Sequence, residues 1–416
     1  MLALALGGVL LGVGEASFGD VRRASGPGAA HAQETPPPSW ARSLEVVASG
    51  VTVRAAPSVR AARRGTVRTG TRLESLGWTR GEGCPSGGWH RVGADAFVCE
   101  GLVRPSAEAP GGEALPVVPP GALLPRVHAF VGADGTWAYA RPDDYFSDEW
   151  SESLGRGFGL AVGERRVLDG VAFARSLGGL WVPEDQLRFA RGSDFEGAVL
   201  EGTLDVAWIA REGVAVRAWN GARTGAVVRR ARARERVRVL GLVPGGRVRI
   251  EDGVVEVGAL RWPRPVDVPA EVAADERWID IRLGAQTLVL YEGARPVFAT
   301  LVSSGRGGPG HATPTGSFRI WVKLAEDTMD DLDRDDVETN YAIEGVPWVQ
   351  YFAEGVALHA AFWHDDFGRP RSHGCVNLSP RDARRLFALT GPTLPPGWDA
   401  VLSTPSDPGT LVRVAP

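Results

Sequence analysis

Two stretches of the chain repeat a single pattern, and this repeat indicates a modular architecture. The stretch that begins at Gly50 reads GVTVRAAPSVRAARRGTVRTGTRLESLG, and from Gly213 the chain reads GVAVRAWNGARTGAVVRRARARERVRVLG. In both stretches Val and Arg alternate between Gly and Pro residues, which is typical of short antiparallel strands. The sequence therefore predicts two small β-barrel modules, at residues 44–104 and 204–264.

Changes in composition mark the boundaries of these modules. Residues 33–43 contain QETPPPSW, and residues 105–124 are rich in Pro, Gly and Ala, so both segments are predicted to be linkers. Between the repeats, residues 125–203 carry GTWAYARPDDYF and GGLWVPEDQLR. We interpret this segment as a third, diverged small β module.

The first residues are typical of an export signal. MLALALGGVLLGVG is an apolar run of about 14 residues, too short to span a bilayer, and Ala30-His31-Ala32 offers a small-residue cleavage site. We expect residues 1–32 to be a signal peptide and the protein to be exported to the periplasm or cell envelope. No other segment reaches the ~18 apolar residues of a membrane helix, so we expect no integral membrane segment.

The three cysteines divide into a predicted pair and a single thiol. Cys84 and Cys99 lie in GCPSGGWHRVGADAFVC, a strand-turn-strand pattern in which a disulfide forms in an oxidising compartment. Cys375 is left over, and a leftover thiol in an exported protein needs a partner chain or a chemical role. The formal net charge of −4 does not provide the basic surface that nucleic acid requires, so no nucleic-acid partner is expected.

From Arg277 onward the pattern becomes that of a larger β domain. WIDIRLGAQTLVLYEGARPVFATLVSSG predicts a hairpin and a further strand, and GSFRIWVKL, WVQYFAEG and GVALHAAF predict three more. SPRDARRLFALTG predicts one short helix, with Ser379 as its N-cap, Pro380 in its first turn and Gly391 at its end. The predicted fold is mainly β, with small β-barrel modules followed by a β-rich domain whose short helix comes after the last cysteine.

The segment around Cys375 combines the residue types that cysteine catalysis needs. An imidazole near a thiol lowers the thiol pKa and returns the proton to a leaving amine. His359, at the end of a predicted strand, is placed to act as this base and acid, whereas His373 in the same turn is predicted to shape the site. The backbone N–H groups of Gly374 and Cys375 are predicted oxyanion donors, and Asn377 either binds the substrate or braces the loop.

Two other interpretations of this cluster remain. A cysteine beside a histidine is often an inert, buried residue. His359, His364, His373 and Cys375 are also donor types that zinc accepts, but a lone cysteine without a CxxC pair argues against a metal site. We therefore expect neither a metal nor a cofactor.

Aromatic side chains near the cluster are candidates for the substrate flank. Trp348, Tyr351 and Trp363 stand in WVQYF and FWHDDF, close in sequence to the histidines. Aromatic residues in strands more often belong to the core, so both interpretations stay open.

Several motifs resemble known families. The repeats, through VRAAPS above all, are similar to bacterial Src-homology-3-type modules. Such modules often bind wall polymers or position a catalytic unit, and simple spacers are the alternative. SHGCVN, its upstream His359 and TPTGSF resemble the L,D-transpeptidase catalytic domain family over residues 277–404. That family cross-links bacterial peptidoglycan.

The resemblance implies a role for each matching residue. Cys375 corresponds to the nucleophile and His359 to the proton donor and acceptor, while Ser372, His373 and Gly374 form the surround of the motif.

Ala360 departs from the Gly or Ser that often follows the upstream histidine. Its backbone carbonyl still provides an acceptor for the imidazole.

The implied substrates are peptidoglycan stem peptides. Cys375 attacks a donor tetrapeptide, terminal D-alanine leaves, and the amine of a second stem peptide takes up the acyl group. Transfer to water instead makes an L,D-carboxypeptidase, and a protein-to-wall attachment enzyme or an inactive wall-binding protein are further alternatives. The acidic run at 326–336 fails the EF-hand pattern and is interpreted as a solvated insertion or as a lid that binds the acceptor amine.

Overall fold

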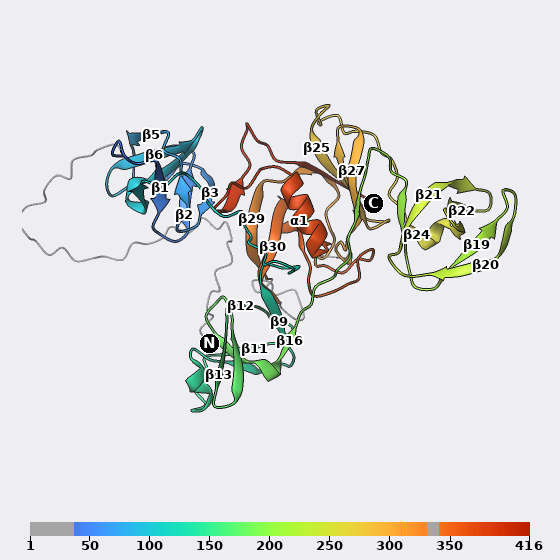
Figure 1. The fold of residues 1–416 in the computed structure, drawn as a ribbon, viewed down its shortest axis with the longest axis horizontal. Coiled ribbons are helices and arrows are strands. Elements are labelled where there is room, and N and C mark those ends of the chain that lie inside the picture. Colours follow the sequence, from blue (N-terminus) through green and yellow to red (C-terminus); the bar gives the residue numbers. More distant parts are fainter. Residues whose placement is uncertain (1–36, 309, 331–340) are drawn as a thin grey trace, which may run out of the picture.

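The computed structural model describes residues 37–308, 310–330 and 341–416, and most of its regular structure is β-sheet (Figure 1). The α-helix α1 (Pro380–Leu389) follows the Cys375 turn. The mainly β fold with a short helix after the cysteine motif is therefore confirmed. The predicted signal peptide and most of the acidic run lie outside the described residues. Within the described ranges, no helix is both long and apolar enough to cross a membrane.

The C-terminal domain, residues 277–415, contains two sheets that share one apolar core (Figure 1). The first sheet has the strand order β17-β27-β26-β25-β34-β28, and β34 pairs in parallel with β25. Its strands are β17 (Ala198–Val199), β25 (Arg277–Arg282), β26 (Thr287–Glu292), β27 (Arg295–Leu301), β28 (Gly316–Arg319) and β34 (Leu411–Ala415). Strand β34 lies beyond the boundary predicted at residue 404.

The second sheet of this domain carries the cysteine motif. Its order is β30-β29-β33, and β31 joins β30 to β32. Its strands are β29 (Val322–Asp330), β30 (Ala342–Ala353), β31 (Val356–Ala360), β32 (Val376–Leu378) and β33 (Trp398–Leu402). The strand predicted from WVQYFAEG is the end of β30, and the strand predicted from GVALHAAF is β31. Helix α1 begins as predicted, because Asp382 N–H donates to the Ser379 N-cap hydroxyl (3.3 Å).

The two repeats fold alike. The first repeat module consists of β1 (Ser43–Val46), β2 (Val51–Arg54), β3 (Arg63–Val67), β4 (Arg72–Leu73), β5 (Gly77–Arg80), β6 (Gly88–Gly93), β7 (Ala96–Cys99), the 3₁₀ turn η1 (Glu100–Leu102) and β8 (Val103–Ser106). The second repeat module consists of β18 (Val206–Ile209), β19 (Val214–Trp219), β20 (Thr224–Ala231), β21 (Arg236–Val243), β22 (Arg247–Ile250), β23 (Gly253–Glu256), η4 (Val257–Ala259) and β24 (Leu260–Arg261).

Equivalent strands make equivalent pairs in the two copies. In the first module β1 pairs with β4 and β8, and β2 pairs with β3 and β7. In the second, β18 pairs with β21 and β24, and β19 pairs with β20 and β23. Among the described residues neither set of strands closes into the predicted barrel. The likeness to Src-homology-3-type modules stays a prediction.

The middle module, residues 127–189, has a small core of its own. Its elements are β9 (Val127–Val131), β10 (Thr136–Ala138), η2 (Pro142–Tyr145), β11 (Glu152–Leu154), β12 (Gly159–Val162), β13 (Glu164–Leu168), β14 (Val171–Arg175), β15 (Trp181–Pro183), η3 (Glu184–Gln186) and β16 (Leu187–Phe189). The segment predicted as a diverged β module is thus built of short strands.

Two modules extend the sheet that carries the cysteine motif. Strand β3 of the first repeat module pairs with β33, and β12 of the middle module pairs with β30. Figure 1 shows the C-terminal domain in the middle with the modules around it. Buried Glu344 on β30 accepts N–H bonds from Ala161, Leu177 and Gly178 of the middle module (3.0–3.1 Å). These contacts join the modules to the strands that frame the site.

A buried lysine ties β29 to the end of α1. Lys323, the only lysine in the sequence, is 1% exposed. Its Nζ donates to Phe387 O (2.6 Å) and Thr390 O (2.9 Å), which are carbonyls at the C-terminus of the helix. Burial lowers the pKa of Lys323 to about 7.

Replacing this lysine should destabilise the fold. The Lys323→Met substitution keeps an apolar stem of similar length but leaves the two helix carbonyls without their donor, so the free energy of unfolding should fall by ~1–3 kcal/mol in urea denaturation. A base whose folded pKa is lowered destabilises the native state below that pKa, and the loss disappears as the pH rises. The free energy of unfolding of the wild type, relative to that of the variant, should therefore increase from about pH 7 upward. A variant that is equally stable at pH 9 would contradict this role.

Candidate active site

The pairing of β31 with β32 places the predicted catalytic residues on one face of the sheet. The two strands are parallel, with Leu358 opposite Val376 and His359 opposite Asn377. Side chains alternate between faces along a strand, so His359 and Asn377 point to the same face. Cys375 immediately precedes β32 and shares the parity of Asn377. The sequence-predicted nucleophile, base and amide are thus brought together.

The turn before Cys375 is held by hydroxyl groups. Thr313 Oγ1 donates to Gly374 O (2.6 Å) and accepts from Gly305 N–H (2.9 Å). Ser372 Oγ donates to Cys375 O and accepts from Gly374 N–H (3.1 Å). Gly374 has φ 139°, a backbone conformation that favours glycine, which explains this residue in the motif. The Gly374 N–H predicted as an oxyanion donor is therefore bonded to Ser372 in this structure.

Cys375 is half-buried and its thiol is protonated at neutral pH. Its Sγ accepts a hydrogen bond from Ala357 N–H (3.4 Å) and lies 3.8 Å from Gly355 O. Burial raises the pKa of the thiol to about 11, and the Ala357 bond opposes the rise only partly. The lowered thiol pKa expected from the sequence is wrong for this structure, because apolar surroundings outweigh the neighbouring imidazole.

His359 is also uncharged. It is 3% exposed, its Nδ1 lies 3.0 Å from Ala360 O, and burial lowers its pKa to about 4. The Ala360 carbonyl thus orients the ring, as predicted. A neutral thiol and a neutral imidazole form a pair in which the proton moves only when the sulfur attacks.

His373 lies on the other side of the turn. Its ring centroid is 4.6 Å from that of His311 and 5.1 Å from that of Tyr341, with which it stacks. This arrangement agrees with the shaping role predicted for His373.

Asn377 is oriented by a histidine that sequence reasoning considered only as a metal ligand. His364 Nε2 lies 3.0 Å from the Asn377 amide, and His364 Nδ1 accepts from Asp366 N–H (3.2 Å). Burial lowers the pKa of His364 to about 4, so the ring is neutral and its single proton sits on Nε2. This tautomer requires the amide oxygen of Asn377 to face His364, so the amide nitrogen takes the opposite position, which is buried and has no partner among the described residues.

The loop between β31 and β32 is anchored from outside the domain. Asp365 forms an ion pair with Arg234 of the second repeat module and accepts from the Ser193 hydroxyl. Asp366 pairs with Arg371 within the loop. The two repeat modules thus contact the C-terminal domain differently, one through a strand and one through the loop that leads to Cys375.

The three aromatic residues predicted to flank the substrate occupy different environments. Trp348 is 2% exposed and packs in the core, so it offers almost no surface to a substrate. Trp363 is half-buried, with its ring 5.8 Å from that of His359. Tyr351 is half-buried and donates to Asp327 Oδ2 (2.8 Å).

Other predicted groups can be placed as well. Cys84 and Cys99 are bonded as a disulfide, with sulfurs 2.02 Å apart. Over the described ranges, no three His, Cys, Asp or Glu side chains are grouped as metal ligands.

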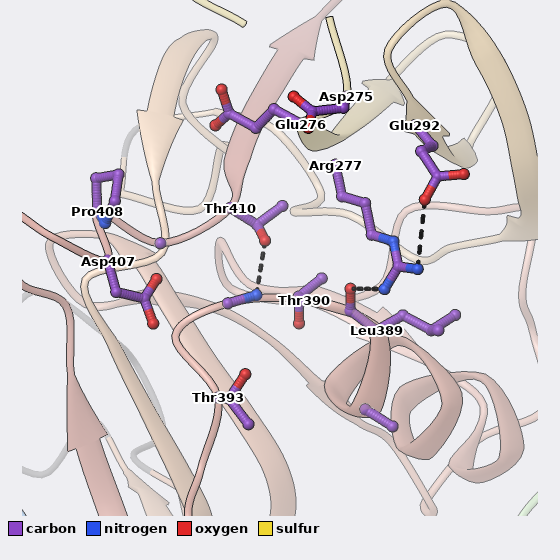
Figure 2. A pocket seen from close by; sticks show the side chains of 13 residues that line it. Asp275, Glu276, Arg277, Glu292, Leu389, Thr390, Thr393, Asp407, Pro408 and Thr410 are labelled. Atoms are coloured by element: carbon purple, nitrogen blue, oxygen red, sulfur yellow. Dashed lines mark hydrogen bonds and ion pairs between the residues drawn. The ribbon is translucent and has the colours of Figure 1, made fainter. Parts of the chain in front are cut away.

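A pocket of about 500 Å³ lies at the C-terminal end of α1, and its lining includes Arg277, Glu292 and Asp407. Figure 2 shows Arg277 donating to Leu389 O (3.3 Å) and Glu292 (3.4 Å) at its edge. The predicted site residues that the structure describes do not line this pocket, so it is separate from the cysteine site.

Thr313, His364 and Asp327 are site residues that the sequence did not single out for these roles. Thr313 stands in TPTGSF, where its hydroxyl could have been considered as a brace for a distant turn. The link from His364 to Asn377 and the link from Asp327 to Tyr351 depend on strand register, which sequence periodicity does not give.

In the comparison with known families, the match lies in the C-terminal domain. Residues 276–414 match the family model described as YkuD, L,D-transpeptidase catalytic domain. No curated protein matches the chain.

Solved structures similar to the chain include three L,D-transpeptidases. A mutant enzyme from Enterococcus faecium is 23% identical (TM-score 0.26) over 34% of this chain and 50% of its own. An enzyme from Stackebrandtia nassauensis is 26% identical (TM-score 0.24) over 35% and 58%, and L,D-transpeptidase 1 of Mycobacterium tuberculosis is 20% identical (TM-score 0.25) over 34% and 62%. The chain thus aligns with about half the length of the Enterococcus protein.

The protonated thiol predicts an unusual pH profile for alkylation. Cys375 in the native chain should react with iodoacetamide at a rate that rises about tenfold per pH unit from pH 7 to 9, without levelling off, because its pKa is raised to about 11. Mass spectrometry of the alkylated chain measures this rate, and the urea-unfolded chain is the control. A native rate that levels off below pH 8 would show a lowered pKa instead.

The hydroxyl of Thr313 should be needed for stability. Thr313→Val leaves Gly374 O and Gly305 N–H unpaired in a buried place, so the free energy of unfolding should fall by ~1–3 kcal/mol. Thr315→Val, at an exposed position in the same segment, is the matched control. If the two variants unfold at the same urea concentration, the hydrogen bonds of the Thr313 hydroxyl do not contribute to stability.

Proposed function

Because residues 276–414 match the family model of the L,D-transpeptidase catalytic domain, we propose that the protein cross-links peptidoglycan stem peptides through an acyl-enzyme on Cys375. The observation that carries the proposal is the shared face on which Cys375, His359 and Asn377 meet at a turn braced by Ser372 and Thr313. Each group is of the type that acyl transfer to a thiol requires.

The first half of the reaction forms a thioester. As Cys375 Sγ bonds to the carbonyl carbon of the donor tetrapeptide, the thiol proton passes to the His359 imidazole. The C–N bond to terminal D-alanine then breaks, and the imidazolium returns the proton to the leaving amine. The lowered pKa of His359 suits this cycle, since the ring starts neutral and gives up its proton readily.

The second half regenerates the enzyme. The amine of an acceptor stem peptide attacks the thioester carbonyl, a C–N bond forms, and the C–S bond breaks. One amine proton passes through His359 to the Cys375 sulfur, so the thiol is restored. The proposed donor for the developing oxyanion is the Cys375 N–H, because the Gly374 N–H is bonded to Ser372 and the side of the Asn377 amide away from His364 is buried.

The acceptor decides between this activity and its alternatives. Water in place of the amine makes an L,D-carboxypeptidase, and an amine on another protein makes a protein-to-peptidoglycan attachment enzyme. A wall-binding protein without activity is disfavoured by the retained thiol and imidazole.

We place the protein outside the cytoplasm, in the periplasm or cell envelope. The Cys84–Cys99 disulfide supports this location, because such bonds persist in oxidising compartments. The repeat modules are proposed to bind wall polymer near the catalytic domain.

Intact-mass analysis with a stem tetrapeptide tests the proposed function. Residues 33–416 should gain the mass of the tetrapeptide minus D-alanine, and dimers joined through two diamino acids should appear in the products. Both should be lost in Cys375→Ala. His359→Ala should lower the acylation rate by ~10²-fold or more, since the proton then has no acceptor.

Three outcomes are distinguishable in that experiment. Tripeptide as the sole product identifies a carboxypeptidase. Dimers that persist in Cys375→Ala exclude Cys375 as the nucleophile. A wild-type chain that gains no mass and makes no product rejects the enzyme in favour of a wall-binding protein.

A further inference from the structure

A phenol that the proposed reaction does not use lies beside the nucleophile. Tyr351 on β30 is paired with Ala357 on β31, and Ala357 N–H donates to Cys375 Sγ (3.4 Å). Directly paired residues project their side chains to the same face, so the phenol and the thiol share a face of the sheet. Burial raises the pKa of Tyr351, the nearby Asp327 adds to the rise, and Cys375 makes a smaller contribution.

The phenol holds a carboxylate at this face. Tyr351 O–H donates to Asp327 Oδ2 (2.8 Å), and Thr328 N–H donates to Asp327 Oδ1 (2.9 Å). Tyr351 is paired with Val322 in the register of β29, and the phenol reaches Asp327 further along that strand. Two residues of β30 before Tyr351, Gly345 (61°) and Trp348 (58°), have positive φ.

The adjacent carboxylate on β29 shows what is unusual about Asp327. Glu326 accepts from two nitrogens of the Arg126 guanidinium (2.8–3.0 Å). Its charge is therefore neutralised. Among the described residues, the partners of Asp327 are a phenol and a backbone N–H, neither of which carries a positive charge. A half-buried carboxylate with neutral partners favours binding of a cation.

Burial raises the pKa of Asp327 to about 6, Asp330 adds to the rise, and the bonds from Tyr351 and Thr328 oppose it. The carboxylate is thus ionised at neutral pH, when an alkyl ammonium is also charged.

We infer that Asp327, held in place by Tyr351, binds the ammonium group of the acceptor, which gives up one proton to water before the neutral amine attacks the thioester on Cys375. This inference rests on the proposed function and names its acceptor class, a primary amine that arrives protonated. Asp327 contacts the substrate in this scheme, and Tyr351 is a positioning residue. An enzyme that concentrates an amine at the thioester transfers the acyl group to that amine in preference to water.

Binding of an isolated amine tests the inference without turnover. In the Cys375→Ala chain, Nα-acetyl-lysine amide presents a side-chain ammonium as its only ionised group, and titration calorimetry or NMR shifts measure its Kd. Adding Asp327→Asn should weaken this binding by roughly tenfold, the effect of losing one favourable charge pair. Nα-acetyl-norleucine amide, which lacks the charge, should bind weakly to both chains.

Glu326→Gln is the matched control, because it removes the neighbouring carboxylate, which is already paired with Arg126. It should leave the Kd for Nα-acetyl-lysine amide within about twofold of the parent value. Circular dichroism and urea denaturation verify that both variants are folded.

Turnover of the active chain separates the two halves of the reaction. With a donor tetrapeptide, Asp327→Asn should acylate Cys375 at nearly the wild-type rate, while the KM for the acceptor amine rises roughly tenfold and tripeptide replaces dimer. Tyr351→Phe should raise the same KM by about threefold with acylation unchanged, whereas a purely structural role would alter both.

The inference is overturned if Asp327→Asn and Glu326→Gln bind the lysine amide equally, or if Asp327→Asn slows acylation as much as aminolysis. Failure of the proposed function gives a different result. In that case Cys375 is never acylated by the donor, and the Kd values of the Cys375→Ala chains alone decide whether Asp327 binds an ammonium.

Discussion

The parallel pairing of β31 with β32 is the constraint on which the site depends. It places His359 opposite Asn377 and sets Cys375 on the same face. A shift of one residue would turn all three side chains into the core that lies against α1, where Leu358 and Val376 now pack. The register is supported at both ends, by the hydroxyl bonds of Ser372 and Thr313 at the turn and by the ion pair of Asp365 with Arg234 in the loop.

The burial of the site determines which of its groups are charged. Burial keeps the thiol protonated and His359 neutral, so the resting pair carries no charge and pays no desolvation penalty. Charge develops only when a substrate carbonyl is attacked, and the donors fixed around the turn then stabilise it. Asp327 is the exception, because it stays ionised while its partners are neutral. The neutral pair and the lone carboxylate would serve two successive substrates, an uncharged peptide carbonyl and a charged amine.

The sequence predicted the local features of the structure better than its long-range pairings. Strand alternation, the cap at Ser379 and the repeat of Gly50 and Gly213 depend on local residue types, and the structure contains each of them. The thiol pKa was mispredicted because a pKa depends on burial, which neighbours in sequence do not determine. The joining of β3 to β33 and of β12 to β30, like the contact of Tyr351 with Asp327, connects residues far apart in the chain. Such pairings are set by register and bends, for which local periodicity carries no signal.

The position of Lys323 has a consequence for the fate of the enzyme itself. A thioester reacts with any amine that reaches it, and most proteins display many lysines on their surface. Here the single lysine of the sequence is sealed between β29 and α1, with its Nζ bonded to helix carbonyls. No lysine of one molecule can therefore become the acceptor for an acyl group carried by another. In the proposed reaction, the folded protein is thereby protected from transfer of the stem-peptide acyl group to its own lysine.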